Sequence, residues 1–306
     1  MDLTFTPLQE ELRAQARGFL EATPAPTWSR LAELGWTGAA VDEAHGGAGL
    51  SFLEEAVLHE EAGRALLHAP LWSTSSLLPF LPAEDQAAVA AGDASWTLAI
   101  GPLVPDLDTA THVAVVGGDT VWELDGTDRE VLATSDETRP LGVVSGGEAG
   151  RALCPSDVLP DLRARSLTIL ALEAVGVGAS ALELSVDYVK EREQFGRRIG
   201  SYQAVSHPLA SSHAELELAR SLTWWAAWCV ANDDPQAQVA ASAANAEAAD
   251  AAVLACERAI QAHGGIGFTW EHVLHRLYKR ALWIQSWEAS PAQLRAEVAS
   301  HLLGAA

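Results

Sequence analysis

The sequence predicts a mainly α-helical protein with one small β-domain in its middle. Alanine is frequent along the 306 residues, and no residue favours helix more strongly. Apolar residues recur with a helical period before about residue 92 and after about residue 156, whereas short apolar runs between glycines fill the middle, as is typical of strands. We therefore expect three domains, over residues 1–92, 93–155 and 156–306.

The first region is expected to form several short helices. Thr6 to Gln9 forms a capping box with proline at the first helical position, and Ser51 to Glu54 forms a second box. A shorter helix is expected over residues 27–34, where a glycine ends it. At each of these helix starts, a nearby side chain can accept a hydrogen bond from the first backbone N–H groups.

The middle region is expected to form a small sheet with little room for a deep pocket of its own. The expected strands cover residues 96–100, 112–116, 120–124, 129–133 and 141–144. The Gly117-Gly118-Asp119 segment lies between the second and third of them, which is typical of a hairpin turn.

The last region is expected to form an antiparallel bundle of long helices. Their expected ranges are 163–192, 203–231, 235–260 and 269–283. Asp234 should cap the third helix, with Pro235 at its first position. Short loops between long helices place neighbours side by side and antiparallel.

Composition excludes several classes of partner. Lys and Arg number 19 against 41 Asp and Glu, and this net charge of −22 repels nucleic acid and anionic lipid. No uninterrupted apolar run approaches the ~18–20 residues of a membrane span. The three cysteines are far apart, so no metal site is expected. Met1 to Thr4 show no export signal, and a cytoplasmic location is therefore expected.

Two stretches of the last region carry residues suited to a phosphate. Gln261 to Phe268 holds three glycines in four positions, which should end a helix and leave several backbone N–H groups free. A plain helix–loop–helix joint would explain the same spacing. Upstream, Arg192, Arg197 and Arg198 follow the first long helix; their guanidinium groups suit a pyrophosphate, or they complement the helix dipole.

Together, Arg192 to Gln203 and Gln261 to Phe268 closely resemble the flavin-binding signatures of the acyl-CoA dehydrogenase family. The resemblance extends over the whole chain: a helical N-terminal domain, a middle β-barrel-like domain and a C-terminal four-helix bundle. The glycine-rich segment 45–50 also matches the family's first domain. Short chains of this type resemble subunits of actinobacterial members, many of which are heterotetramers of two unlike chains acting on steroid CoA thioesters.

The resemblance implies FAD bound at a subunit interface, and therefore a homo- or hetero-oligomer; a heterotetramer with a longer family member is the expected form. The implied cofactor-binding residues are Arg192, Phe195, Gln203, Gln261, Gly264 and Gly265. The first three would hold the adenosine-diphosphate part of the flavin, and the last three would meet that part from the neighbouring subunit.

The resemblance also implies the reaction. An α,β double bond is introduced into a bulky acyl-CoA, such as a steroid-derived one, by α-proton abstraction and β-hydride transfer to flavin, which then passes electrons to an electron-transfer acceptor. Counting along the chain, the base matches Glu288. The family's usual Gly-Thr after the base is Ala289-Ser290 here, followed by Pro291, so Glu288 could instead cap the last helix or be solvated.

A second departure concerns the flavin ring. The polar segment that normally lines the ring is missing, and Gly101-Pro102-Leu103 stands near its place. Two alternatives therefore remain open. The chain could be a catalytically degenerate partner that completes the FAD site of a heteromeric dehydrogenase, or a flavin-fold protein recruited to another biosynthetic reaction.

Overall fold

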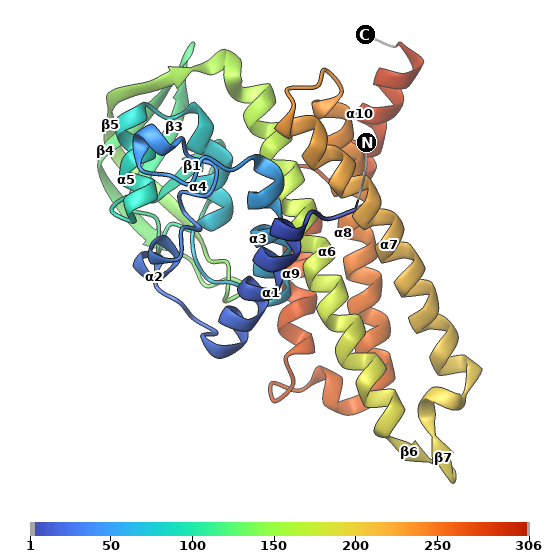
Figure 1. Cartoon of the computed structure of the whole chain (residues 1–306). Coiled ribbons are helices and arrows are strands. Elements are labelled where there is room, and N and C mark those ends of the chain that lie inside the picture. The colour runs from blue at the N-terminus through green and yellow to red at the C-terminus, as the bar shows by residue number, and fades with distance from the viewer. Residues whose placement is uncertain (1–3, 305–306) are drawn as a thin grey trace.

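The computed structural model describes residues 4–304; Met1 to Leu3, part of the stretch considered for an export signal, lie outside it. Figure 1 shows long helices running side by side, with the sheet and the N-terminal helices gathered against one end of them. The mainly helical fold with a small sheet is confirmed. The division at residues 92 and 155 stays a prediction.

The N-terminal part consists of short helices. They are α1 (Pro7–Ala22), α2 (Trp28–Glu33), η1 (Glu43–His45), α3 (Phe52–Arg64), α4 (Leu71–Leu77), η2 (Leu78–Phe80) and α5 (Ala83–Ala91). Both predicted capping boxes are present: the Thr6 side chain accepts from the backbone of Gln9, and the Glu54 side chain accepts from the backbone of Ser51. Local sequence signals therefore fix where these helices start.

The sheet has the strand order β1-β3-β4-β5-β2. Its strands are β1 (Trp96–Ala99), β2 (Val104–Pro105), β3 (His112–Gly117), β4 (Thr120–Val131) and β5 (Leu141–Pro155). β1 and β3 are parallel, and the other pairs are antiparallel. The Thr97 hydroxyl donates to the Pro105 carbonyl at 2.7 Å, which draws the two edge strands together and makes the sheet barrel-like.

Two strand predictions were wrong in extent. The expected strands 120–124 and 129–133 fall in one strand, β4, which ends at Val131, and β5 continues to Pro155 instead of ending at residue 144. The two strands pair along almost their whole length, from Thr120 opposite Pro155 to Val131 opposite Gly142. Gly126, Gly146 and Gly147 take a positive φ within this pairing without changing its register, and the irregularities of the ladder lie instead between Val121 and Leu124.

The C-terminal part is the predicted bundle. Its helices are η3 (Ser156–Val158), α6 (Leu159–Glu191), α7 (Gln203–Ala231), α8 (Ala237–His263), η5 (Gly264–Phe268), α9 (Leu274–Ser286) and α10 (Pro291–Leu303). By length and composition α6 could cross a membrane, but 67% of its apolar window is buried inside the protein. Its apolar residues therefore serve the core that α6 forms with α7 and α8.

Three helix starts differ from prediction. α6 begins at Leu159, four residues early. α8 begins at Ala237, because Asp234 Oδ1 accepts from the Gln236 backbone and closes a turn before the helix. α9 begins at Leu274 instead of residue 269, because the backbone N–H and hydroxyl of Thr269 both donate to the Ile266 carbonyl and so belong to the preceding turn.

Glycine allows the bundle to contact the N-terminal helices closely. A Cβ on Gly63 of α3 would lie 2.2 Å from the Glu173 carbonyl oxygen, and one on Gly176 of α6 would lie 2.0 Å from that of Glu60. Neither position can hold a side chain without separating the two helices. This close approach fixes α3 against α6, which carries part of the wall of the site described below.

Candidate functional site

The first flavin-like stretch forms the lower tip of the bundle in Figure 1. Arg192 ends α6, and β6 (Glu193–Gln194) then pairs with β7 (Arg197–Arg198) in a small hairpin that the sequence did not predict. Its turn is Phe195-Gly196, with both residues in the left-handed region. A left-handed backbone costs energy for a bulky residue such as Phe195. No burial of its ring within this chain offsets that cost, because Phe195 is 93% exposed. The hairpin therefore presents an aromatic ring to whatever binds here.

The second stretch joins α8 to α9. Gln261 is exposed in the last turn of α8, and Gly264 ends the helix with a φ of 66°. The Gly264 N–H donates to carbonyls of the last turn, and η5 follows at once, so the expected group of free N–H groups forms only in part. A Cβ at Gly264 or Gly265 would meet nothing within 4 Å. The surface here is open and can be approached closely by a ligand.

Both stretches lie at the same end of the bundle. Tyr188, one turn before the end of α6, stacks on His263 at the end of α8, with ring centroids 4.3 Å apart. The ring centroid of His263 in turn lies 4.6 Å from that of His272, in the segment before α9. One chain therefore brings Arg192 to Gln203 and Gln261 to Phe268 together, and Figure 1 shows the two joints at one end.

Unpaired positive charge collects at this end. Of the 19 Lys and Arg, all within residues 4–304, those without a carboxylate partner are Arg129, Arg192, Arg197, Arg198, Arg276 and Lys279. Arg129 bonds backbone carbonyls of the sheet. The other five lie on the first stretch or on the first two turns of α9. In a chain of net charge −22, such a cluster fits an anionic group, and the diphosphate of FAD meets this requirement.

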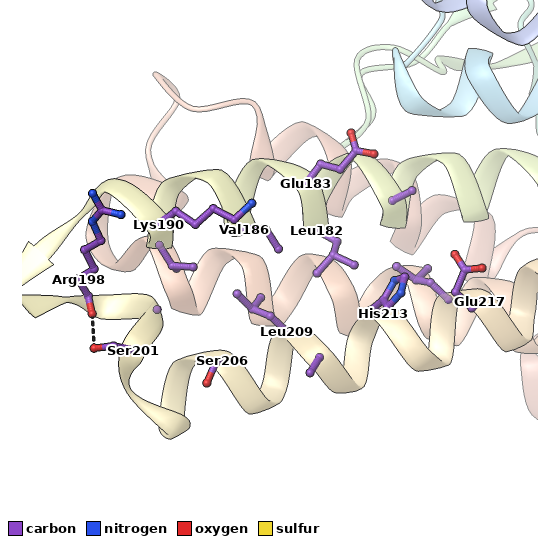
Figure 2. Close-up of a pocket in the computed structure, with 15 residues that line it drawn as sticks. Leu182, Glu183, Val186, Lys190, Arg198, Ser201, Ser206, Leu209, His213 and Glu217 are labelled. Carbon is purple, nitrogen blue, oxygen red and sulfur yellow. Dashed lines mark hydrogen bonds between the residues drawn. The ribbon is translucent and has the colours of Figure 1, made fainter.

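A groove opens beside the cluster, between α6 and α7 (Figure 2). Its volume is about 730 Å³, and its walls are mainly apolar, with Leu182, Val186 and Leu209 among them. Arg198, which belongs to the first stretch, lies at one end, and Glu217 lies toward the other (Figure 2). The described chain leaves this groove without a covering element.

Glu288 lies away from the cation cluster, just past the end of α9, and lines a cavity of about 400 Å³. The cavity walls come from α4, α6, the end of α9 and the segment after β1. They include Trp72, Ser73, Ser76, Leu98, Leu162, Ser166, Trp287 and the segment 100–103. Gly101-Pro102-Leu103, expected near the flavin-lining position, thus shares a cavity with the expected base. The walls are mostly apolar, which suits an acyl group.

The Glu288 side chain is turned inward from an exposed backbone. Its φ is +59°, in the left-handed region, and only 18% of its side chain is exposed. Ser166 Oγ donates to one carboxylate oxygen at 3.4 Å, and Arg163 Nε lies 3.8 Å from the other. Burial raises the pKa of Glu288 above its ordinary value, and Arg163 and Ser166 offset this in part.

The alternative role of Glu288 as a helix cap does not hold. Ser290 caps α10: its hydroxyl accepts from the backbone of Gln293, whose side chain accepts from the backbone of Ser290. Pro291 takes the first helical position. The Ala289-Ser290-Pro291 departure therefore serves the start of α10 and leaves Glu288 free to face the cavity.

Three tryptophans form a cluster beside Glu288 that sequence reasoning missed. Trp72 meets Trp283 and Trp287 edge to face, and the last two stack with centroids 4.8 Å apart. Trp72 Nε1 donates to Ser166, whereas the buried Nε1 atoms of Trp283 and Trp287 have no partner. An unpartnered buried donor is costly. Trp287 also lines the cavity that holds Glu288.

A buried ion-pair network supports the tryptophan cluster from behind. The Arg139 guanidinium lies over Trp72 and Trp283, at 5.1 and 5.0 Å from the ring centroids. Arg139 pairs with Glu173 of α6 at 2.8 Å, and Arg280 of α9 pairs with Asp136 at 2.6 Å. Because Arg139 and Asp136 lie between β4 and β5, the network fixes the sheet to the bundle.

Comparison with known proteins agrees with this architecture. Residues 167–303 match the family described as acyl-CoA dehydrogenase, C-terminal domain, and residues 6–81 match acyl-CoA dehydrogenase, N-terminal domain. The acyl-CoA dehydrogenase IpdE2 of Mycobacterium tuberculosis is 35% identical over 278 residues, covering 88% of this chain and 82% of IpdE2.

Solved structures share the fold. A variant of the Tcur3481-Tcur3483 steroid ACAD is 27% identical, with a TM-score of 0.85 over 97% of this chain and 98% of that chain. The ChsE4-ChsE5 complex from Mycobacterium tuberculosis is 22% identical, with a TM-score of 0.88 over 100% of each chain. With its two matched domains and its cation cluster, the chain is an FAD-dependent oxidoreductase and belongs to the acyl-CoA dehydrogenase family.

Proposed function

We propose that this chain introduces an α,β double bond into a bulky acyl-CoA, with Glu288 as the base that removes the α-proton. The observation that carries the proposal is the Glu288 side chain, turned into a mostly apolar cavity of about 400 Å³. Such walls favour a large apolar acyl group over a short polar one. The relationship to a steroid ACAD supports a steroid-derived acyl group.

The surroundings of Glu288 suit proton abstraction. Burial raises the pKa of the Glu288 carboxyl above its ordinary value. A carboxylate with a higher pKa is a stronger base and accepts an α-proton more readily. Ser166, which also lines the cavity, donates to one carboxylate oxygen and so holds the carboxylate beside the cavity. FAD, when bound, would supply the acceptor for the β-hydride, and an electron-transfer acceptor would reoxidise it.

The cofactor contacts proposed for the adenosine-diphosphate part are Arg192, Phe195, Gln203, Gln261, Gly264 and Gly265. Arg192 and its neighbours supply positive charge without carboxylate partners, and Phe195 supplies an exposed ring. The glycines leave open space for close approach. These contacts lie in the α6–α7 and α8–α9 joints at one end of the bundle, before α9, whereas Glu288 lies after the end of α9, so the ring side of the site is separate from the phosphate side.

We further propose a hetero-oligomer with a longer family member. Phe195, Phe268 and Trp270 expose at least 73% of their surface at the cation cluster, and a partner chain would bury them. The relatives named as Tcur3481-Tcur3483 and ChsE4-ChsE5 are assemblies of two chains, which supports the same arrangement here. A cytoplasmic location is also proposed, supported by three buried free cysteines.

One experiment tests both proposals. The chain is purified alone and after co-expression with a longer family member, and visible flavin absorbance is measured in both. More flavin per chain on co-expression is expected; full occupancy in the chain alone would refute the need for an unlike partner. In the flavin-loaded preparation, Glu288→Gln should reduce α-proton exchange of an acyl-CoA at least a hundredfold, because it removes the base.

A second candidate is a degenerate partner subunit. The observation that favours it is the 100–103 segment, which lines the Glu288 cavity without polar side chains. On this reading Glu288→Gln leaves turnover of the assembled complex unchanged, and flavin binding alone depends on this chain. The same measurement therefore decides between the two functions.

A further inference from the structure

Arg163 connects Glu288 to the last helix of the chain. Arg163 lies near the start of α6, and its two terminal nitrogens donate to both carboxylate oxygens of Glu297 on α10, at 3.1 and 3.0 Å. Ser242 of α8 donates to the same carboxylate at 2.9 Å. Glu297 is therefore held between two helices and holds the Arg163 guanidinium in a fork-like, two-bond geometry.

The same guanidinium is near the expected base. Its Nε lies 3.8 Å from Glu288 Oε2, a distance at which charges attract but no hydrogen bond forms. Among described residues, Glu288 is the only other carboxylate within ion-pair distance of Arg163. Arg163 is thus shared unequally, with two hydrogen bonds to Glu297 and none to Glu288.

We propose that Arg163 and Glu297 are a positioning pair for Glu288, in which Glu297 holds the guanidinium back so that the Glu288 carboxylate stays directed into the cavity. The inference rests on the proposed role of Glu288 as the base. Neither Arg163 nor Glu297 lines the cavity, so both act through Glu288 and not on the substrate. Without Glu297, the guanidinium would close on Glu288 and draw its carboxylate out toward α10.

The two partners act on Glu288 with opposite sign. Arg163 favours the ionised form of the carboxyl and lowers its pKa, whereas the negative charge of Glu297 raises it. Within residues 4–304, no other charged side chain lines the cavity beside Glu288: α4, α9 and the segment after β1 contribute only apolar residues and serines, and Asp106 lies behind Ser73. The pair is therefore the main charge control on this group.

Substitutions of the two partners should consequently shift the pH dependence in opposite directions. Arg163→Gln removes the positive charge, so Glu288 binds its proton more tightly and the acidic limb of kcat/KM moves to higher pH. Glu297→Gln releases Arg163 and removes a negative charge, and both changes move that limb to lower pH. Each rate on the limb should change about threefold, as expected for a partly exposed charge pair.

The control is Glu247→Gln, which breaks a comparable ion pair between α8 and α10. Glu247 pairs with Arg295 at 3.0 Å, with similar side-chain exposure, and does not contact Glu288. This variant should leave the pH profile unchanged. Equal shifts in all three variants, or shifts of the same sign for Arg163→Gln and Glu297→Gln, would show a merely structural effect and overturn the inference.

A second readout does not depend on activity. A carbodiimide with an amine nucleophile modifies protonated carboxyl groups, and peptide mass spectrometry reports the labelling of Glu288 as a function of pH. Arg163→Gln should extend labelling to higher pH, and Glu297→Gln should confine it to lower pH; unchanged curves refute the positioning pair. If Glu288→Gln keeps full turnover while the labelling curves shift as expected, the proposed base fails and the positioning pair stands.

Discussion

Replacing Arg280 by methionine should destabilise the protein by about 3–5 kcal/mol, the cost of removing one member of a buried ion pair. Arg280 is fully buried, and its Nε donates to Asp136 Oδ2 at 2.6 Å while Nη2 donates to the Thr138 carbonyl at 2.8 Å. Burial tends to raise the pKa of Asp136, but Arg280 and Thr138 lower it below its usual value. Without Arg280, Asp136 stays buried as an uncompensated charge or takes up a proton.

Urea unfolding followed by tryptophan fluorescence measures this cost, because Trp283 lies one turn from Arg280 on the same helix. Arg276→Met is the matched control: Arg276 lies one turn earlier on α9, is exposed and has no carboxylate partner. The control should change the free energy of unfolding by less than about 0.5 kcal/mol. If Arg280→Met costs less than about 1 kcal/mol, the network does not fix the sheet to the bundle, and the reasoning is refuted.

Two more predictions concern charges elsewhere. Arg192→Ala in the co-expressed complex should reduce flavin retained after gel filtration, while the exposed Arg30→Ala should not; equal occupancy contradicts the proposed phosphate contact. Burial would raise the pKa of Glu55, but Arg165 and His59 lower it to about 2. The ionised Glu55 carboxylate should therefore contribute about 3 kcal/mol to the free energy of unfolding, and this stability should be lost as pH falls from about 4.5 to about 2. Glu55→Gln should lack this pH dependence in acid unfolding. If the midpoint pH of acid unfolding is the same in the variant as in the unchanged protein, the prediction is refuted.

Local patterns predicted much of the fold. Capping boxes, proline at first helical positions and a helical period depend on residues within a few positions of one another, so α1, α3 and the long helices could be located before the structure was known. Errors arose where hydrogen bonds decide between neighbouring turns. Thr269 resembles a helix start but donates backward to Ile266, and the glycines of β4 and β5 interrupt the pattern without interrupting the pairing.

The site was predictable only in part. Motif residues such as Arg192 and Gly264 are short-range signals, whereas the groups that surround Glu288 come from distant parts of the sequence. Ser166 lies 122 positions from Glu288, and Trp72 lies 94 positions from Ser166. Of the three clustered tryptophans, only Trp287 is adjacent to Glu288 in the sequence. Tertiary packing alone shows that Glu297 and Glu288 compete for one arginine.

The arrangement of α9 explains why binding and chemistry can be tested separately. The helix has 13 residues and is therefore about 20 Å long, with the cation cluster at its start and Glu288 after its end. Arg280 anchors its middle to the loop between β4 and β5. Arg192 is exposed and distant from Glu288, so solvent and salt screen its charge. Removing that charge should therefore leave the pKa of Glu288 unchanged. Arg280 is the position from which a single substitution should disturb both ends, because it sets where the helix lies against the sheet.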